Sequence, residues 1–332
     1  MSDLSLTAIS TIFADYKTSF VGKGLQNSEP VLNKKGRPIF RKGNQCGVTK
    51  LRYPAGNFKA LRMWQTESAN SNVIYKHISK YIEQNPTPYL LNLSYQKDTI
   101  KFNGEYFSAL LMDWCSGCSL REYLNSYIAN TGKLTQLKNA IEGMFKDMNQ
   151  RGISHGDIHH NNICISEHGE PILIDYDSMF VPSLKGIEDD CLGYSGYQLP
   201  GARENNKYLS HKTDYFSQLI VILTLECLIQ KPSLWNSYLD EDDTVSLIFK
   251  KEDFENLKKS KIYLDIRDLK GDVPFLLSVL EQYMQKTSIN DLWPYYETNK
   301  SQQSIYCIKC GHKIINTTDK YCTECGSLIY YE

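Results

Sequence analysis

The sequence predicts a mixed α+β chain of two lobes that ends in a small zinc ribbon, and three observations support this prediction. Short β-prone runs dominate from Gly36 to Trp114, whereas amphipathic helical patterns dominate from Ser119 onward. Two Cys-x-x-Cys-Gly motifs stand near the C-terminus. We therefore expect four regions: a helical extension over 1–35, a small lobe over 36–112, a helical lobe over 113–298 and a ribbon over 299–332.

Length and composition place the chain among ordinary globular proteins. Its 332 residues exceed one average domain, and 41% of them are hydrophobic and 23% charged. The 37 Lys and Arg residues nearly balance the 38 Asp and Glu residues, so the overall charge does not support binding to nucleic acid or to a membrane. The longest mainly apolar run, Leu219–Leu225, is too short to cross a bilayer, and the N-terminus lacks a signal-peptide pattern. We expect a cytoplasmic protein, which also fits six scattered cysteines without a disulfide framework.

The first half of the chain has the pattern of strands. The runs PIF, GVTKLRY and FKALRMW are β-prone and are separated by the turns GNQ and PAGN. Residues 68–84 place apolar side chains at helical spacing, and that helix should end at Asn85-Pro86. The run KFNGEYFSALLMDW then predicts a second hairpin. Residues 1–30 should contain a helix that packs on its own domain.

The second half has the pattern of helices. LREYLNSYIAN and LTQLKNAIEGMFKDMNQRG are amphipathic, and the second should end at Gly152. Further helices are expected over 213–230 and 244–286. Residues 154–212 are polar and rich in loops, with NICI and PILID as the only expected strands. So long an irregular segment within a compact domain is usually functional.

Within that segment, one stretch combines the residue types that phosphoryl transfer needs. HGDIHHNN spans residues 155–162, and ILIDYD spans residues 172–177. A carboxylate can orient an attacking hydroxyl, and carboxylate and amide oxygens bind Mg²⁺. The motifs and their separation resemble those of the protein-kinase-like superfamily, in which H-R-D-x-x-x-x-N precedes D-F-G.

The resemblance covers about residues 36–298 and implies a two-lobed protein-kinase-like fold that uses ATP and Mg²⁺. The catalytic residues that it implies are Asp157, His159, Asn162 and Asp175. The nucleotide contacts that it implies are Gly43, Gly47, Arg62, Met112, Asp113, Asn162 and Asp175. Asn162 and Asp175 would bind Mg²⁺, while His155 and Asp214 would have structural roles.

Several positions depart from the kinase pattern. Arg62 stands where the strand lysine of V-A-I-K belongs, and no acidic residue lies in the middle of the following helix to pair with it. Gly156 replaces the loop arginine that binds an activation phosphate, and Asp177 replaces the glycine of D-F-G. His159 gives the motif H-G-D-x-H, which, together with I-D-Y-D, resembles the aminoglycoside and choline phosphotransferase branch instead.

Three functions remain open on these grounds. The long segment after Asp177, with MFVP and LGYSGYQLPGAR, resembles bacterial protein-kinase-like proteins and favours a protein Ser/Thr hydroxyl as the substrate. A small-molecule kinase and a nucleotide-binding pseudokinase are the alternatives. A metal hydrolase would use His155, His159 and His160 as ligands, but it leaves Asn162 and Asp175 unexplained.

The last four cysteines predict a zinc site. Cys307 and Cys310 form one Cys-x-x-Cys-Gly motif, and Cys322 and Cys325 form the other. Each such turn aims two thiolates at one point, so together they can bind one structural Zn²⁺. Because so short a segment cannot bury a stable core, the metal would supply its folding energy. The segment resembles short bacterial zinc ribbons; its balanced charge gives no support for nucleic acid binding and favours a protein-docking module.

Overall fold

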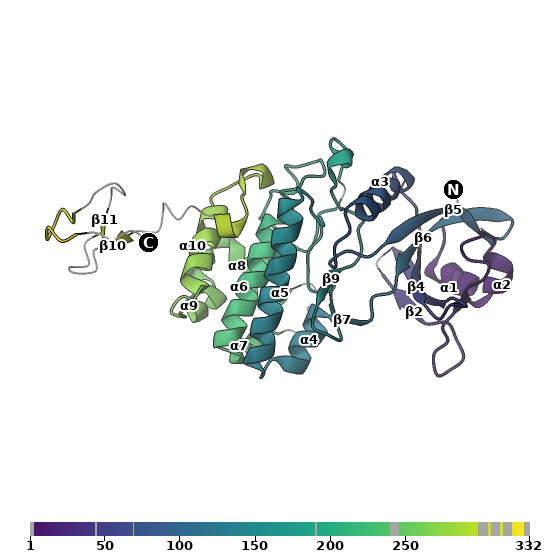
Figure 1. Cartoon of the computed structure of the whole chain (residues 1–332), viewed down its shortest axis with the longest axis horizontal. Coiled ribbons are helices and arrows are strands. Elements are labelled where there is room, and N and C mark those ends of the chain that lie inside the picture. Colours follow the sequence, from purple (N-terminus) through teal and green to yellow (C-terminus); the bar gives the residue numbers. More distant parts are fainter. Residues whose placement is uncertain are drawn as a thin grey trace.

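The structure is a computed structural model that describes residues 3–43, 45–68, 70–189, 191–239, 246–297, 305–306, 313–314 and 321–328. Figure 1 shows a β-rich lobe, which carries the N-terminus, next to a helical lobe. The mixed α+β architecture predicted from the sequence is therefore confirmed.

A six-stranded antiparallel sheet forms the first lobe. Its strands are β1 (Glu29–Pro30), β2 (Phe40–Lys42), β3 (Cys46–Arg52), β4 (Phe58–Trp64), β5 (Leu93–Phe102) and β6 (Glu105–Asp113). They pair in the order β1-β3-β4-β6-β5, and β2 also pairs with β3. The β3–β4 and β5–β6 hairpins lie where the turn residues predict them, which confirms both predictions.

Helices cover the two faces of this sheet. They are α1 (Leu6–Ala14), α2 (Tyr16–Ser19) and α3 (Ser71–Gln84). Successive strand residues point to opposite faces, so Leu61 and Met63 of β4 join the core under α1, while Arg62 emerges on the side of α3. The N-terminal helix therefore packs on its own domain, as predicted.

The second lobe is mainly helical. Its α-helices are α4 (Leu120–Tyr127), α5 (Thr131–Gln150), α6 (Tyr215–Gln230), α7 (Ser233–Tyr238), α8 (Lys251–Glu255), α9 (Lys261–Ile266) and α10 (Val273–Tyr283). Helix α6 is apolar around almost its whole circumference, because it runs through the core and packs beside α5. No helix in the described part of the chain is long and apolar enough to span a membrane.

A small sheet lies where the two lobes meet. Strands β7 (Gly117–Ser119), β8 (Ile163–Ser166) and β9 (Pro171–Leu173) pair in that order, and the chain passes from β6 into β7 through residues 114–116. The HGDIHHNN segment precedes β8, and the residues Asp175 to Asp177 follow β9. The fold thus brings both motifs to the junction of the lobes (Figure 1). Further along, β10 (Ile305–Tyr306) pairs with β11 (Lys313–Ile314).

Candidate active site

Asp214, at the start of α6, fixes the backbone of the HGDIHHNN loop. Its carboxylate accepts hydrogen bonds from the backbone N–H groups of His155 and Gly156, the latter at 2.9 Å. Gly156 has a φ of +85°, and a Cβ placed there would lie 2.0 Å from the carbonyl oxygen of Ser178, so this position accepts only glycine. The buried ring of His155 reaches the other motif, with Nε2 2.9 Å from the carbonyl oxygen of Ile174. Burial lowers the pKa of His155, which keeps the ring neutral in this structural role.

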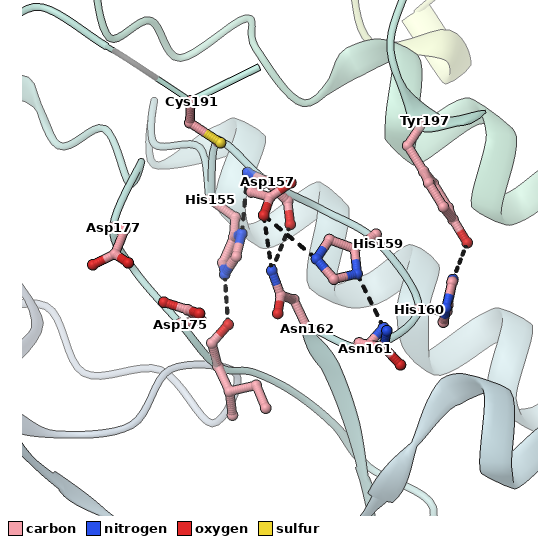
Figure 2. Close-up of polar contacts among 12 residues, drawn as sticks. His155, Asp157, His159, His160, Asn161, Asn162, Asp175, Asp177, Cys191 and Tyr197 are labelled. Carbon is pink, nitrogen blue, oxygen red and sulfur yellow. Dashed lines mark hydrogen bonds and ion pairs between the residues drawn. The ribbon is translucent and has the colours of Figure 1, made fainter. Parts of the chain in front are cut away.

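Asp157 and Asn162 face each other across the loop (Figure 2). The amide nitrogen of Asn162 donates to the backbone oxygen of Asp157 at 2.9 Å and to its Oδ2 at 3.3 Å. Nε2 of His159 lies 3.4 Å from the same Oδ2. Burial alone would raise the pKa of Asp157, but the contacts with His159 outweigh it and hold that pKa below its usual value. Asp157 is therefore an ionised carboxylate held by two neighbours.

The second oxygen of the Asp157 carboxylate is covered. Oδ1 is buried and has no hydrogen-bond partner among the described residues. A Cβ placed on Gly193 would lie 3.2 Å from it, so the backbone after Asp177 passes directly over this oxygen. Two rings of the same segment contact the loop: Tyr194 packs against His159 at a centroid distance of 4.2 Å, and the Tyr197 hydroxyl lies 2.7 Å from Nδ1 of His160. We call residues 189–197, without residue 190, the covering segment.

Arg203 contacts both the covering segment and the HGDIHHNN loop, which we also call the catalytic loop. Its Nη2 donates to the carbonyl oxygens of Gly156 at 3.0 Å and Cys191 at 2.7 Å. The same nitrogen lies 3.1 Å from Oδ2 of Asp189, and both side chains are 3% exposed. Asp189 and two backbone carbonyl oxygens thus hold the guanidinium of Arg203 in the interior, where it is 5% exposed.

Asp175 and Asp177 lie on the side of the site where the sequence predicts magnesium, which we call the metal side. Asp175 follows β9 with a φ of +71°, a left-handed conformation that non-glycine residues rarely adopt and that is common at functional sites. Its Oδ1 accepts from Nη1 of Arg62 at 2.6 Å. Burial raises the pKa of Asp175 to about 6, and Asp177 adds to this effect although Arg62 opposes it. Arg62 holds the pKa of Asp177 below its usual value, against the effect of burial.

These residues fit a magnesium ion that is bound together with a nucleotide. The side chains of Asp175 and Asp177 are 43% and 47% exposed, so their oxygens can be reached from solvent. The N–H of Ile174, the residue before Asp175, donates to the carbonyl oxygen of Asn162 at 3.0 Å, which joins the two motifs. No group of three or more His, Cys, Asp or Glu side chains in the described residues is arranged to hold a metal on its own. Mg²⁺ commonly takes one or two carboxylates and completes its shell with phosphate oxygens and water.

The predicted nucleotide contacts lie in different surroundings. Arg62 is 8% exposed and is joined to the metal side, as described above. The carboxylate of Asp113 is already bound by Lys59 at 2.9 Å and by the amide nitrogen of Asn92 at 3.0 Å. Met112 is 6% exposed and belongs to the main core, and the backbone N–H of Asp113 donates to the carbonyl oxygen of Asn92 at 2.9 Å, so the polar groups of Asp113 named here already have partners.

The two glycines of the predicted phosphate loop also differ from each other. Gly43 begins the turn between β2 and β3 and donates its N–H to the carbonyl oxygen of Cys46 at 2.9 Å. A Cβ placed on Gly47 would lie 2.5 Å from the ring of Phe40 and 2.8 Å from a methyl group of Ile9. Close packing beneath α1 thus explains Gly47 without a nucleotide.

The arrangement of the histidines argues against a metal hydrolase. The rings of His155 and His160 are directed to a backbone oxygen and to the Tyr197 hydroxyl, and His159 faces Asp157 and Tyr194 (Figure 2). Sequence reasoning missed four residues of the site: Tyr75, Asp177, Asp189 and Tyr194. Only Asp177 had a visible signal, because an acid in place of the D-F-G glycine needs a cationic partner.

The ribbon is described only in part. Cys307 and Cys310 lie outside the described residues. Around the second pair, the N–H of Cys322 donates to Ser327 and the N–H of Gly326 donates back to Cys322, both at 2.8 Å. Gly326 has a φ of +68°. This is the tight turn that the Cys-x-x-Cys-Gly pattern requires.

One comparison with known proteins identifies a related domain. A model of the ABC1 atypical kinase-like domain matches residues 106–183, which run from β6 through Asp157, Asn162 and Asp175 to beyond Asp177. No curated protein matches the chain. This region is thus similar to an atypical kinase-like domain, which supports an ATP-binding phosphotransferase or a pseudokinase and implies the use of ATP and Mg²⁺.

Proposed function

We propose that this protein transfers the γ-phosphoryl group of ATP to a Ser or Thr hydroxyl of another protein. One observation supports transfer above all: an ionised Asp157, oriented by Asn162 and His159, stands beside a second carboxylate, Asp175, that contacts Arg62. A nucleotide-binding scaffold would need the second half of this arrangement but not the first.

Each group has a role that its surroundings support. Asn162 and Asp175 would hold Mg²⁺, which neutralises the charge on the transferred phosphoryl group. The guanidinium of Arg62 would donate hydrogen bonds to phosphate oxygens. Asp157 would orient the acceptor hydroxyl and accept its proton, and His159 positions the carboxylate for this task. These roles need no covalent intermediate with the protein.

The covering segment is the reason for preferring a protein acceptor. It buries Oδ1 of Asp157, so an acceptor must displace the segment before its hydroxyl can reach that oxygen. A polypeptide can do this by binding along the displaced segment, whereas a small molecule offers few contacts to offset the cost. A small-molecule kinase remains the second candidate because His159 resembles that branch.

Labelled ATP distinguishes the three functions. Purified protein is incubated with Mg²⁺ and ATP labelled at the γ-phosphate, alone, with a protein extract, and with a set of small hydroxylated and amino compounds. We expect labelled protein. Label in small molecules alone would favour the second candidate, and nucleotide binding without transfer would identify a pseudokinase. Asp157→Asn serves as the control for contaminating kinases, since it removes the proposed base.

We also propose that Cys307, Cys310, Cys322 and Cys325 bind one structural Zn²⁺ and that the ribbon docks a protein partner. The tight turn at Gly326 supports the metal site. Elemental analysis of wild type and Cys310→Ser tests it. We expect one zinc per chain in wild type and a clear loss in the variant, because one thiolate of four is removed. Equal zinc content in both proteins would contradict the site.

A further inference from the structure

In the kinase pattern, the strand cation at the position of Arg62 pairs with an acidic residue in the middle of the following helix, and α3 has no acidic residue there. The only acidic residue of α3 is Glu83, in the last turn of the helix. Arg62 is nevertheless buried, at 8% exposed, and an unpaired buried cation would be costly. Its charge must therefore be balanced by groups outside the usual helix position.

Asp175 and Asp177 supply the balancing charge, and Tyr75 joins Asp177 to Arg62. Both oxygens of the Asp177 carboxylate accept from Arg62, Oδ1 from Nη1 at 3.0 Å and Oδ2 from Nη2. This is the bidentate geometry in which a guanidinium and a carboxylate bind most strongly. Tyr75, on α3, donates its hydroxyl hydrogen to Oδ1 of Asp177 and accepts a hydrogen bond from Nη1 of Arg62 at 3.3 Å. One small network thus joins strand β4, helix α3 and the metal side of the site.

We propose that Tyr75 and Asp177 are the positioning residues for Arg62 and together replace the helix acid, so that α3 controls the phosphate-binding guanidinium through a tyrosine hydroxyl. The inference rests on the nucleotide-binding half of the proposed function. It assigns a role to a position, Tyr75, that neither the kinase pattern nor the matched region 106–183 includes.

The charge of the cluster explains why a tyrosine suits this place. Asp175 and Asp177 already surround Arg62, which gives two carboxylates to one guanidinium. A glutamate on α3 would add a third negative charge at a buried position, with a cost from both burial and repulsion. The Tyr75 hydroxyl donates to Asp177 without adding charge. The same geometry explains the arginine, because a lysine has no planar fork for Asp177.

The competing explanation is that Tyr75 only fills the core. It is 1% exposed, and its ring lies 5.6 Å from that of Trp64. A packing role and a positioning role differ in which ligand they affect. If Tyr75 positions Arg62, the loss of its hydroxyl weakens binding of the phosphates and leaves binding of the nucleoside unchanged.

Affinities for Mg–ATP and for adenosine, measured by calorimetry on the full chain, separate the two roles. For Tyr75→Phe we expect a loss of about tenfold in Mg–ATP affinity, the scale of one hydrogen bond within a charged network, with adenosine affinity unchanged. In an Arg62→Lys background the same substitution should have little further effect, because the fork that Tyr75 supports is gone. Tyr81→Phe is the matched control on the same helix; it removes contacts with Arg151, among them one of 3.5 Å to its carbonyl oxygen, and should alter neither affinity.

Three results would overturn the inference. Equal losses for ATP and adenosine would indicate a packing role, and so would a loss of ATP affinity of the same size in the wild-type and Arg62→Lys backgrounds. An unchanged ATP affinity in Tyr75→Phe would show that Asp177 alone suffices. Failure of phosphoryl transfer with normal ATP affinity contradicts the proposed function and leaves this inference standing, whereas a wild-type protein that binds no ATP contradicts both.

Discussion

The two sides of the candidate site differ in how open they are. On the nucleotide side, Asp175 and Asp177 are nearly half exposed, and their charges meet Arg62. On the acceptor side, one oxygen of Asp157 is buried without a hydrogen bond from any described residue, beneath a segment that Arg203 contacts. The charged groups of the nucleotide side are thus assembled and accessible, while the acceptor side has first to open.

Under the proposed function, nucleotide binding and phosphoryl transfer would therefore depend on separate parts of the chain. The nucleotide side is positioned by β4, α3 and the residues after β9, and the acceptor side by the catalytic loop and the covering segment. An unpartnered buried carboxylate oxygen costs free energy, which an incoming hydroxyl donor would recover. Changes on one side should therefore leave the function of the other largely intact.

The largest effect is expected from Asp157→Asn. An amide cannot accept the proton of the acceptor hydroxyl, so transfer should slow by about 10²–10⁴-fold. Turnover of labelled ATP into protein, measured at saturating Mg–ATP, checks this prediction. A variant that transfers at the wild-type rate would remove Asp157 from the mechanism.

Arg203→Gln should destabilise the fold. It leaves Asp189 without its cation at a site where both side chains are 3% exposed, and breaking such a buried pair costs about 3–5 kcal/mol. The free energy of unfolding in urea measures the loss. Lys258→Gln is the matched control, because Lys258 is 67% exposed in its pair with Glu281, where solvent screens the charges and the loss should be small. Equal losses in the two variants would mean that Arg203 does not hold the covering segment.

Much of the fold could be predicted from the sequence because its signals are local. The apolar spacing of α5 and the YPAGN turn each specify one element, and the interval from Asp157 to Asp175 indicates the superfamily. The same holds for Asp214, whose place before a long apolar helix suggested the loop anchor that its hydrogen bonds now describe.

The remaining features depend on contacts between residues that are distant in the chain. Tyr75 meets Asp177 across 102 positions, and no local pattern marks either residue as the partner of Arg62. Gly47 fitted a phosphate loop in the sequence, yet its surroundings are the ring of Phe40 and the side chain of Ile9 from another element. Such pairings arise from tertiary packing within and between the lobes, which the periodicity of the sequence does not encode.

Lowering the pH should weaken the binding of Mg–ATP on the nucleotide side. The pKa of Asp175 is raised to about 6, and only the ionised carboxylate binds Mg²⁺ well. Above this pH the affinity for Mg–ATP should be constant; below it the carboxylate is protonated and affinity should fall by up to about tenfold per pH unit. Titrations across this range check the prediction. Asp175→Asn controls for protonation of ATP itself, and a wild-type pH profile that matches the variant's would contradict the role of Asp175.

The smallest effect is expected from dephosphorylation. Gly156 offers no charge to an activation phosphate, and Arg203 is already bound to Asp189. Treatment with a phosphatase should therefore leave both Mg–ATP affinity and the transfer rate almost unchanged. A large loss of transfer would reveal a phosphate site elsewhere on the chain.

The separation of the two sides is tested most directly by the Mg–ATP affinities of Asp157→Asn and Asp175→Asn, measured side by side by calorimetry. We predict that Asp157→Asn binds Mg–ATP like wild type, because this residue faces the acceptor. Asp175→Asn should bind it clearly more weakly, since it loses a charged metal ligand. The reverse pattern, or wild-type affinity in both variants, would contradict the assignment of Asp175 to the nucleotide and Asp157 to the acceptor.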